Sequence, residues 1–153
     1  MKWIDSHCHV GRGIMNGQDV DELLETMDRL NIEQAVIVPW DQAIAVDNRE
    51  GNQFTLDIAA KHPNRFIPFC TVNPWFGQRA LDELDRAVGL GARGLKLHPA
   101  YQGFQLTDPF VLPVIERALR HGLPIYVPTG VPIVSMPMQL AYVAELYPQG
   151  IFI

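Results

Sequence analysis

The sequence lacks several features that would place the protein in a specialised class. Only two of its 153 residues are cysteine, which excludes a disulfide framework and fits a reducing cytoplasm. The 12 basic residues are outnumbered by 17 acidic ones and form no basic block, so nucleic-acid binding is not expected. No apolar run approaches the roughly 18 residues of a membrane span, and no signal-peptide pattern opens the chain. We therefore expect a cytoplasmic protein that binds neither nucleic acid nor membrane.

The composition that remains is that of an ordinary globular domain, with 48% hydrophobic and 19% charged residues. We expect one domain over residues 1–153, because no linker interrupts the pattern. Apolar runs of strand length alternate with segments of helical periodicity. Strands are expected over about 2–7, 35–38, 65–72, 94–98 and 123–127. Helices are expected over about 20–30, 48–61, 78–90 and 138–147, and over a segment that starts at about 109 or 113 and ends at 120.

This alternation predicts a parallel α/β sheet built from βαβ units. Five such units and a sixth strand from about residue 150 fit a doubly wound sheet, and they are fewer than the eight units of a (β/α)₈ barrel. The chain stops inside an apolar run at Ile153, so we expect it to be a piece of a longer protein.

The run IDSHCH, residues 4–9, stands at the end of the first expected strand. Alternate side chains of a strand share a face, so Asp5, His7 and His9 point the same way, with the two histidine Cα atoms about 6.5 Å apart. Neutral imidazoles at that spacing can bind one metal ion. His7 and His9 are therefore the candidate metal ligands, and the apolar lead-in over residues 1–4 is expected to be buried.

Further candidates follow from the rule that parallel α/β proteins bind ligands at the carboxyl ends of their strands. The longer loops leave these ends, which also favours function there. His62 and His121 fall in the last turns of helices, where a cation is favoured, and are not expected to take part. The strand-end residues placed beside the histidine pair are Trp40, Asp41, Asn73, Lys96, His98, Tyr101 and Thr129.

Lys96 is unusual because it lies inside a strand that reads as buried. It could orient a substrate carboxylate, act as an acid–base group, or be carboxylated and bridge two metals. The alternative is that the Lys96 stem is buried and its amine merely reaches solvent at the end of the strand. Asp41 is equally open, since it could contact substrate or cap its own loop.

Several segments together carry a resemblance: residues 4–10 (IDSHCHV), 62–66 (HPNRF), 92–99 (ARGLKLHP) and 122–127 (GLPIYV). This set resembles the amidohydrolase superfamily, and within it the amidohydrolase-related group that includes aminocarboxymuconate-semialdehyde decarboxylase. The resemblance spans nearly the whole chain. It implies a distorted (β/α)₈ TIM barrel, incomplete here, with a metal, usually zinc, at the strand ends. The metal ligands it implies are the two histidines of the motif, a fifth-strand histidine and an eighth-strand aspartate.

The activity that the resemblance implies is that of a metal-dependent hydrolase or a non-oxidative decarboxylase. Such an enzyme acts on a small carboxylate, lactone or amide through a metal-activated water. In this reading His7 and His9 bind the divalent metal, and Lys96 and His98 act on the substrate or the water. The substrate pocket is then lined by Trp40, Asp41, Tyr101 and Thr129.

The sequence departs from the family pattern at Pro128, which stands where the family has the fifth-strand histidine. Proline cannot bind a metal, so His98 is the possible substitute ligand, and the later strands are absent. Two alternatives stay open: a barrel of the same family that has lost metal chemistry and binds a small carboxylate, and an open α/β binding domain. We expect the 153 residues alone to be inactive, because an unclosed sheet leaves an edge that can aggregate. Whether the protein is a homo-oligomer is left open.

Overall fold

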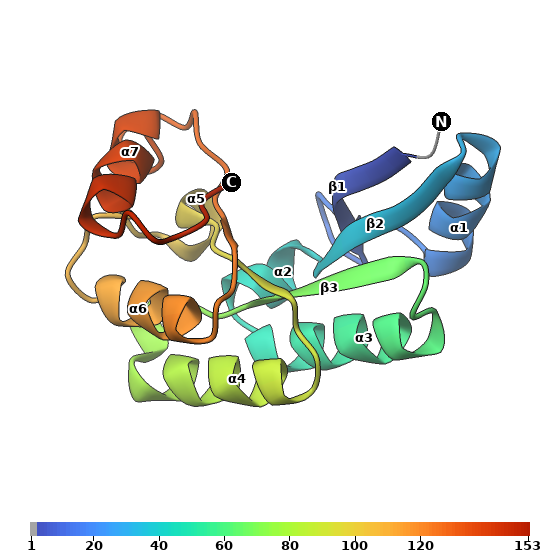
Figure 1. Ribbon diagram of the computed structural model, residues 1–153, viewed down its shortest axis with the longest axis horizontal. Helices are drawn as coiled ribbons and strands as arrows, with labels where there is room; N and C mark the ends of the chain where they lie inside the picture. Colours follow the sequence, from blue (N-terminus) through green and yellow to red (C-terminus); the bar gives the residue numbers. More distant parts are fainter. Residues whose placement is uncertain (1–2) are drawn as a thin grey trace.

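Five parallel strands form one sheet in the computed structural model, which describes residues 3–153 (Figure 1). Their spatial order follows their order in the chain, whereas a doubly wound sheet reverses at a switch point. The sheet curls into part of a barrel, so the barrel expectation is confirmed and the doubly wound alternative is wrong. The strands are β1 (Trp3–Val10), β2 (Ile32–Pro39), β3 (Phe66–Thr71), β4 (Gly94–Lys96) and β5 (Ile125–Tyr126).

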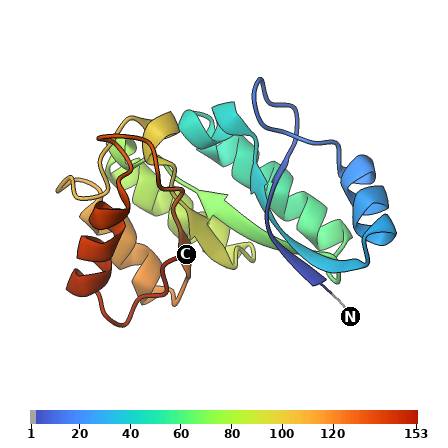
Figure 2. The ribbon, with the colours of Figure 1, turned by 90° about the horizontal axis from the view of Figure 1, so that it is seen from above.

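The long helices lie on the outer side of the curled sheet (Figures 1 and 2). They are α1 (Val20–Arg29), α3 (Asn48–Lys61), α4 (Gln78–Gly89), α6 (Leu112–Arg120) and α7 (Pro137–Leu146), close to the expected positions. Sequence periodicity missed three short helices in the loops after β2, β3 and β4, because so few residues show no period. These are α2 (Asp41–Ala45), η1 (Pro74–Phe76) and α5 (Pro99–Gln102). Across residues 3–153, none of the helices has the length and hydropathy needed to cross a bilayer.

The two ends of the sheet differ from the expectation. Trp3 and Ile4 are 56% and 61% exposed, so the prediction of a buried lead-in is wrong; β1 is an edge strand with a neighbour on one side. Residues 1–2, which belong to the same prediction, lie outside the described residues. The expected sixth strand is present only as an isolated parallel bridge between Ile125 and Phe152.

The hydrophobic core consists of two clusters on the outer side of the sheet. The larger one joins β3, β4 and β5 to α4 and α6, and includes Leu84, Leu95 and Ile115. The smaller one joins β1, β2 and β3 to α1 and α3, and includes Met27 and Ile37. Since both clusters use β3, this strand connects the two halves of the molecule.

Buried amide side chains join the loops at the carboxyl ends of the strands. Gln102 Nε2 donates to the carbonyl oxygens of Ile44 at 3.0 Å and Val72 at 2.9 Å, and its Oε1 accepts from the backbone N–H of His98 at 2.8 Å. Asn48 Oδ1 accepts from the backbone N–H of Asn73. Buried polar groups are stable only when they are paired, so these bonds hold the three loops after β2, β3 and β4 in one arrangement.

The contact between Gly94 and Phe69, which are partners in the β3–β4 register, gives a test of the fold. A Cβ atom on Gly94 would collide with the Phe69 ring, whereas one on Gly89, the last residue of α4, would meet no atom within 4 Å. We expect Gly94→Ala to lower the free energy of unfolding by about 1–3 kcal/mol through overpacking. Gly89→Ala, the control, should leave it unchanged or raise it by up to about 1 kcal/mol. Urea unfolding measures both, and equal stability of the two variants would contradict the packing described.

Candidate active site

The two histidines of β1 lie side by side, as their place on one strand face predicts. Their ring centroids are 4.7 Å apart and their planes are perpendicular. His9 Nδ1 lies 2.9 Å from the backbone oxygen of Pro39, at the end of β2. A carbonyl can only accept, so Nδ1 carries the proton and Nε2 keeps its lone pair for a ligand. The bond to Pro39 on the neighbouring strand therefore orients the His9 ring so that Nε2 could bind a metal ion.

The Lys96 side chain extends from β4 into the concave side of the curled sheet. It is only 1% exposed, which confirms the expected burial. Its Nζ atom lies 3.0 Å from Nε2 of His7 and 4.0 Å from the centroid of the Tyr126 ring. A buried ammonium group is costly unless it has such partners. The residues that surround it come from the first and the fifth strand, so the curled sheet brings its two end strands together here.

Burial shifts the pKa values of this cluster toward the neutral forms. It lowers the pKa of Lys96 to about 7. Burial, followed by the charge of Lys96, lowers the pKa of His7 to about 3 and that of His98 to about 4. The pKa of His9 is also lowered, first by burial. The imidazoles are therefore uncharged near neutral pH, which is the form that binds metal ions.

His98 follows β4 and is paired with Tyr101 on the short helix α5. The two rings stack in parallel with centroids 3.7 Å apart, and the backbone N–H of Tyr101 donates to His98 Nδ1 at 3.3 Å. The Tyr101 hydroxyl accepts from Asn16 Nδ2 at 2.5 Å. Tyr101 thus joins the loop after β1 to the loop after β4, beside the histidine cluster.

Asp41 anchors the loop over residues 11–18 rather than the histidines. Its Oδ1 and Oδ2 atoms accept from the backbone N–H groups of Ile14 at 3.1 Å and Met15 at 2.8 Å. Burial raises the pKa of Asp41, but the N–H groups of Met15, Ile14 and Gln42 outweigh it and hold the pKa below its ordinary value. This geometry supports the loop-capping alternative, and contact of Asp41 with substrate stays a prediction.

The structure places the other candidates as follows. The Trp40 ring packs against the backbone of Gly11 and lies edge-on to Phe54 at 5.5 Å. Thr129 is exposed after β5, so its role as a substrate contact also stays a prediction. His62 and His121 are the C-cap residues of α3 and α6, as expected.

The tyrosine of β5, Tyr126, was missed by sequence reasoning. Its ring lies parallel to that of His7, with centroids 4.7 Å apart and an angle of 7° between the planes. It is also the register partner of Lys96 on the neighbouring strand. Register partners in a parallel pair face the same side, so the inward direction expected for Lys96 could have identified Tyr126.

The donor set fits part of a metal site. His7 and His9 have imidazole nitrogens that could bind a metal, and Pro128 has no side chain that could. Among residues 3–153 no group of three or more histidine, cysteine, aspartate or glutamate side chains is arranged to hold a metal ion. A catalytic zinc ordinarily takes three protein ligands and a water. The described residues could therefore offer the two imidazoles, and no third ligating side chain, His98 included, is arranged with them.

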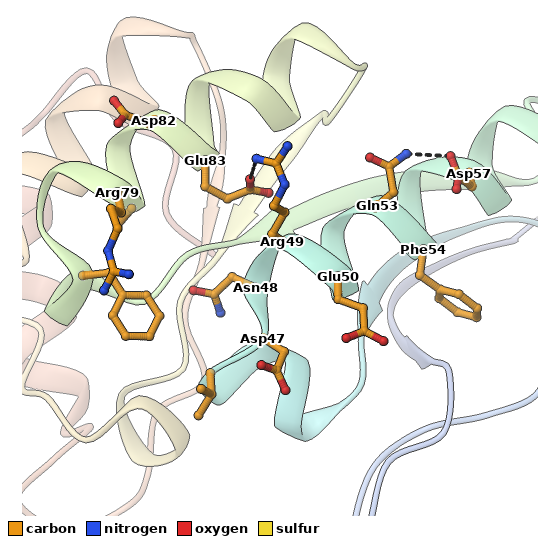
Figure 3. Close-up of a pocket in the computed structure, with 13 residues that line it drawn as sticks. Asp47, Asn48, Arg49, Glu50, Gln53, Phe54, Asp57, Arg79, Asp82 and Glu83 are labelled. Atoms are coloured by element: carbon orange, nitrogen blue, oxygen red, sulfur yellow. Dashed lines mark hydrogen bonds and ion pairs between the residues drawn. The ribbon is translucent and has the colours of Figure 1, made fainter.

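A large hollow in the structure lies elsewhere. It is a groove of about 970 Å³ on the outer side, between the first turns of α3 and α4. Asp47, Arg49, Glu50 and Phe54 project toward it from one side, and Arg79 and Glu83 from the other (Figure 3). The predicted site residues are not among those that line it.

The chain belongs to the amidohydrolase family, whose sequence model matches residues 4–152. The fold and the histidine pair agree with this assignment. A comparison with curated proteins finds no match.

Solved structures show the same fold. The chain is similar to 5-carboxyvanillate decarboxylase from Sphingomonas paucimobilis, with 15% identity and a TM-score of 0.80 over 99% of this chain and 66% of that one. It is similar to 2,6-dihydroxybenzoate decarboxylase from Rhizobium, with 19% identity and a TM-score of 0.65 over 97% and 54%. The 5-carboxyvanillate decarboxylase from Novosphingobium aromaticivorans, solved with bound manganese, matches with 22% identity and a TM-score of 0.63 over 82% and 38%. The chain thus spans one to two thirds of the length of these proteins.

Replacing Asp41 by alanine is expected to release the loop over residues 11–18. The N–H groups of Ile14 and Met15 would lose charged acceptors, each worth about 1.5–3 kcal/mol. Hydrogen exchange at these two amides should therefore accelerate at least about tenfold at pH 7. Asp57→Ala on α3, whose carboxylate accepts from Gln53 on the surface, is the control and should change neither rate.

The same variant tests the lowered pKa of Asp41. A carboxyl group whose pKa is depressed by folding stabilises the folded state above its unfolded pKa, and the contribution is lost as the pH falls through the folded pKa. The difference in unfolding free energy between the unaltered chain and Asp41→Ala should be full above about pH 4 and shrink below it. Urea unfolding at pH 6 and pH 3 measures this. An equal difference at both pH values would show that the carboxylate charge contributes nothing.

Proposed function

We propose that the chain forms the strand-end part of the active site of a metal-dependent hydrolase or decarboxylase. The observation that carries this proposal is the pair of neutral imidazoles on β1, with His9 held by Pro39 so that its Nε2 is free, beside the buried Lys96. In this proposal His7 and His9 supply two ligands of a divalent metal. No third histidine, cysteine or carboxylate of the described residues is arranged with them, so water or substrate would fill the other positions.

The metal, when bound, supplies a polarised substrate oxygen and an acidified water. Manganese, which the Novosphingobium decarboxylase holds, and zinc, which the family resemblance favours, both accept imidazole nitrogen. The protein side chains then orient the substrate. Lys96 presents a positively charged or neutral amine next to His7, and His98 presents its second ring nitrogen beside Tyr101.

The substrate we infer is a small aromatic carboxylate that loses carbon dioxide without oxidation. The support is that the solved relatives named above act on 2,6-dihydroxybenzoate or 5-carboxyvanillate. A cation buried at the strand ends suits a carboxylate, because a charge-assisted hydrogen bond is strongest in a desolvated site. Lys96 would hold the carboxylate, and the stacked rings of His98 and Tyr101 offer an aromatic surface beside it.

A second function is favoured by two specific observations. Pro128 removes a ligand, and Lys96 Nζ lies against the ring nitrogen of His7 that faces the site. Both suit a barrel that binds a small carboxylate without a metal. Metal binding decides between the two functions.

Loss of either histidine is expected to abolish metal binding. We expect His7→Ala and His9→Ala each to weaken the affinity for Mn²⁺ and Zn²⁺ by at least about 100-fold, since each removes a direct ligand. Isothermal titration calorimetry of the purified chain measures this. His62→Ala, at the end of α3, is the matched control and should bind as the unaltered chain does. A chain that binds neither ion would overturn the metal-dependent function and leave the carboxylate-binding one.

The role of Lys96 is tested with 2,6-dihydroxybenzoate as the probe. Lys96→Met keeps the apolar stem and removes the charge, so the affinity for the probe should fall by about 10- to 100-fold. Lys61→Met, at the exposed end of α3, is the control and should change nothing. Fluorescence titration measures both. Unchanged binding by the Lys96 variant would show that the carboxylate is held elsewhere.

A further inference from the structure

We propose that Tyr126 is a positioning residue that holds the ring of His7 and the amine of Lys96 in place across the interior of the sheet. This inference rests on the proposed function, because it concerns how a metal ligand and its neighbour are oriented. Tyr126 is outside the set of residues expected from the sequence.

The first support is that the orientation of His7 needs a restraint. His9 has its backbone acceptor at Pro39, but the described contacts give the His7 ring only one hydrogen-bond partner, the Nζ atom of Lys96. The Lys96 amine restrains the orientation of the His7 ring only weakly, because it lies at the end of four rotatable bonds and the ring itself can turn about two torsions. The parallel Tyr126 ring, 4.7 Å away at an angle of 7°, restricts the plane in which His7 can lie.

The second support is that the same ring also restrains Lys96. The Nζ atom lies 4.0 Å from the Tyr126 centroid, within the range of a cation–π contact. Lys96 and Tyr126 are register partners on β4 and β5, so their side chains project from the same face of the sheet. The ring thus supports both groups that meet at His7 Nε2, and it fixes the distance between them.

The third support comes from the position of Tyr126 in the sheet. It lies on β5, at the end of the sheet opposite β1, and is followed two residues later by Pro128, which cannot bind a metal. The stack on His7 therefore crosses the concave side from one end strand to the other. In this protein β5 contributes the Tyr126 ring, which packs against His7, the proposed metal ligand on β1.

The experiment compares two substitutions of this ring. Tyr126→Phe keeps the ring, and Tyr126→Leu removes it at similar hydrophobicity. We expect the leucine variant to weaken Mn²⁺ affinity about 10-fold, as loss of a supporting contact to a metal ligand does, and the phenylalanine variant to stay within about twofold. Tyr142→Leu on α7, where the tyrosine is 52% exposed, is the matched control and should bind normally. Calorimetry with Mn²⁺ alone is the measurement.

A second readout is independent of metal and of the stability of the leucine variant. In histidine-labelled protein, the ring C–H signals of His7, assigned from the His7→Ala spectrum, should be shifted upfield by the stacked ring. The shift should persist in Tyr126→Phe. Unshifted His7 signals in the unaltered chain would overturn the proposal even if Tyr126→Leu did not fold.

The outcomes separate the two proposals. If His7→Ala binds Mn²⁺ as tightly as the unaltered chain, or if the unaltered chain binds none, the metal-dependent function fails and this inference fails with it. If His7→Ala loses Mn²⁺ while a folded Tyr126→Leu keeps full affinity, only the positioning role is overturned. Loss of affinity in the leucine variant with recovery in the phenylalanine variant supports it.

Discussion

A lysine amine buried inside a parallel sheet is the constraint on which the arrangement of this site depends. Lys96 is almost fully shielded from water, and its partners are His7 Nε2 and the face of Tyr126. One partner lies on the first strand and the other on the fifth, so a flat sheet of this strand order would keep them apart. The sheet must therefore be curved for the buried Lys96 amine to reach both of its partners.

The parts around this contact are held in two different ways. The loops at the strand ends are joined to one another by buried amides, such as Gln102. The donors and acceptors of Gln102 are satisfied by backbone groups of these loops. The loop over residues 11–18 instead depends on Asp41 and on the bond from Asn16 to Tyr101. The loops after β2, β3 and β4 are thus joined by buried amides, whereas the loop over residues 11–18 depends on a few side chains.

Predictions that rested on the pattern within one segment agree with the structure. Predictions that also depended on contacts with distant segments agree only in part. The expected helix over about 48–61 is α3 with the same bounds, because apolar periodicity within a segment reports its own buried face. The placement of His7 and His9 on one face follows from strand alternation in the same way. Burial of Trp3 and Ile4 was expected from their apolarity, but it depends on a second neighbouring strand, and the edge strand β1 has none.

The sequence by itself determined the order of the five strands and the five long helices, the family to which the chain belongs, the histidine pair and the inward direction of Lys96. Only the tertiary structure decided that Tyr126 stacks on His7, that Asp41 holds a loop, and that Trp40 packs against Gly11. The physical reason is separation along the chain. His7 and Lys96 lie 89 residues apart, and their contact is set by how far the sheet curls, which no single segment encodes.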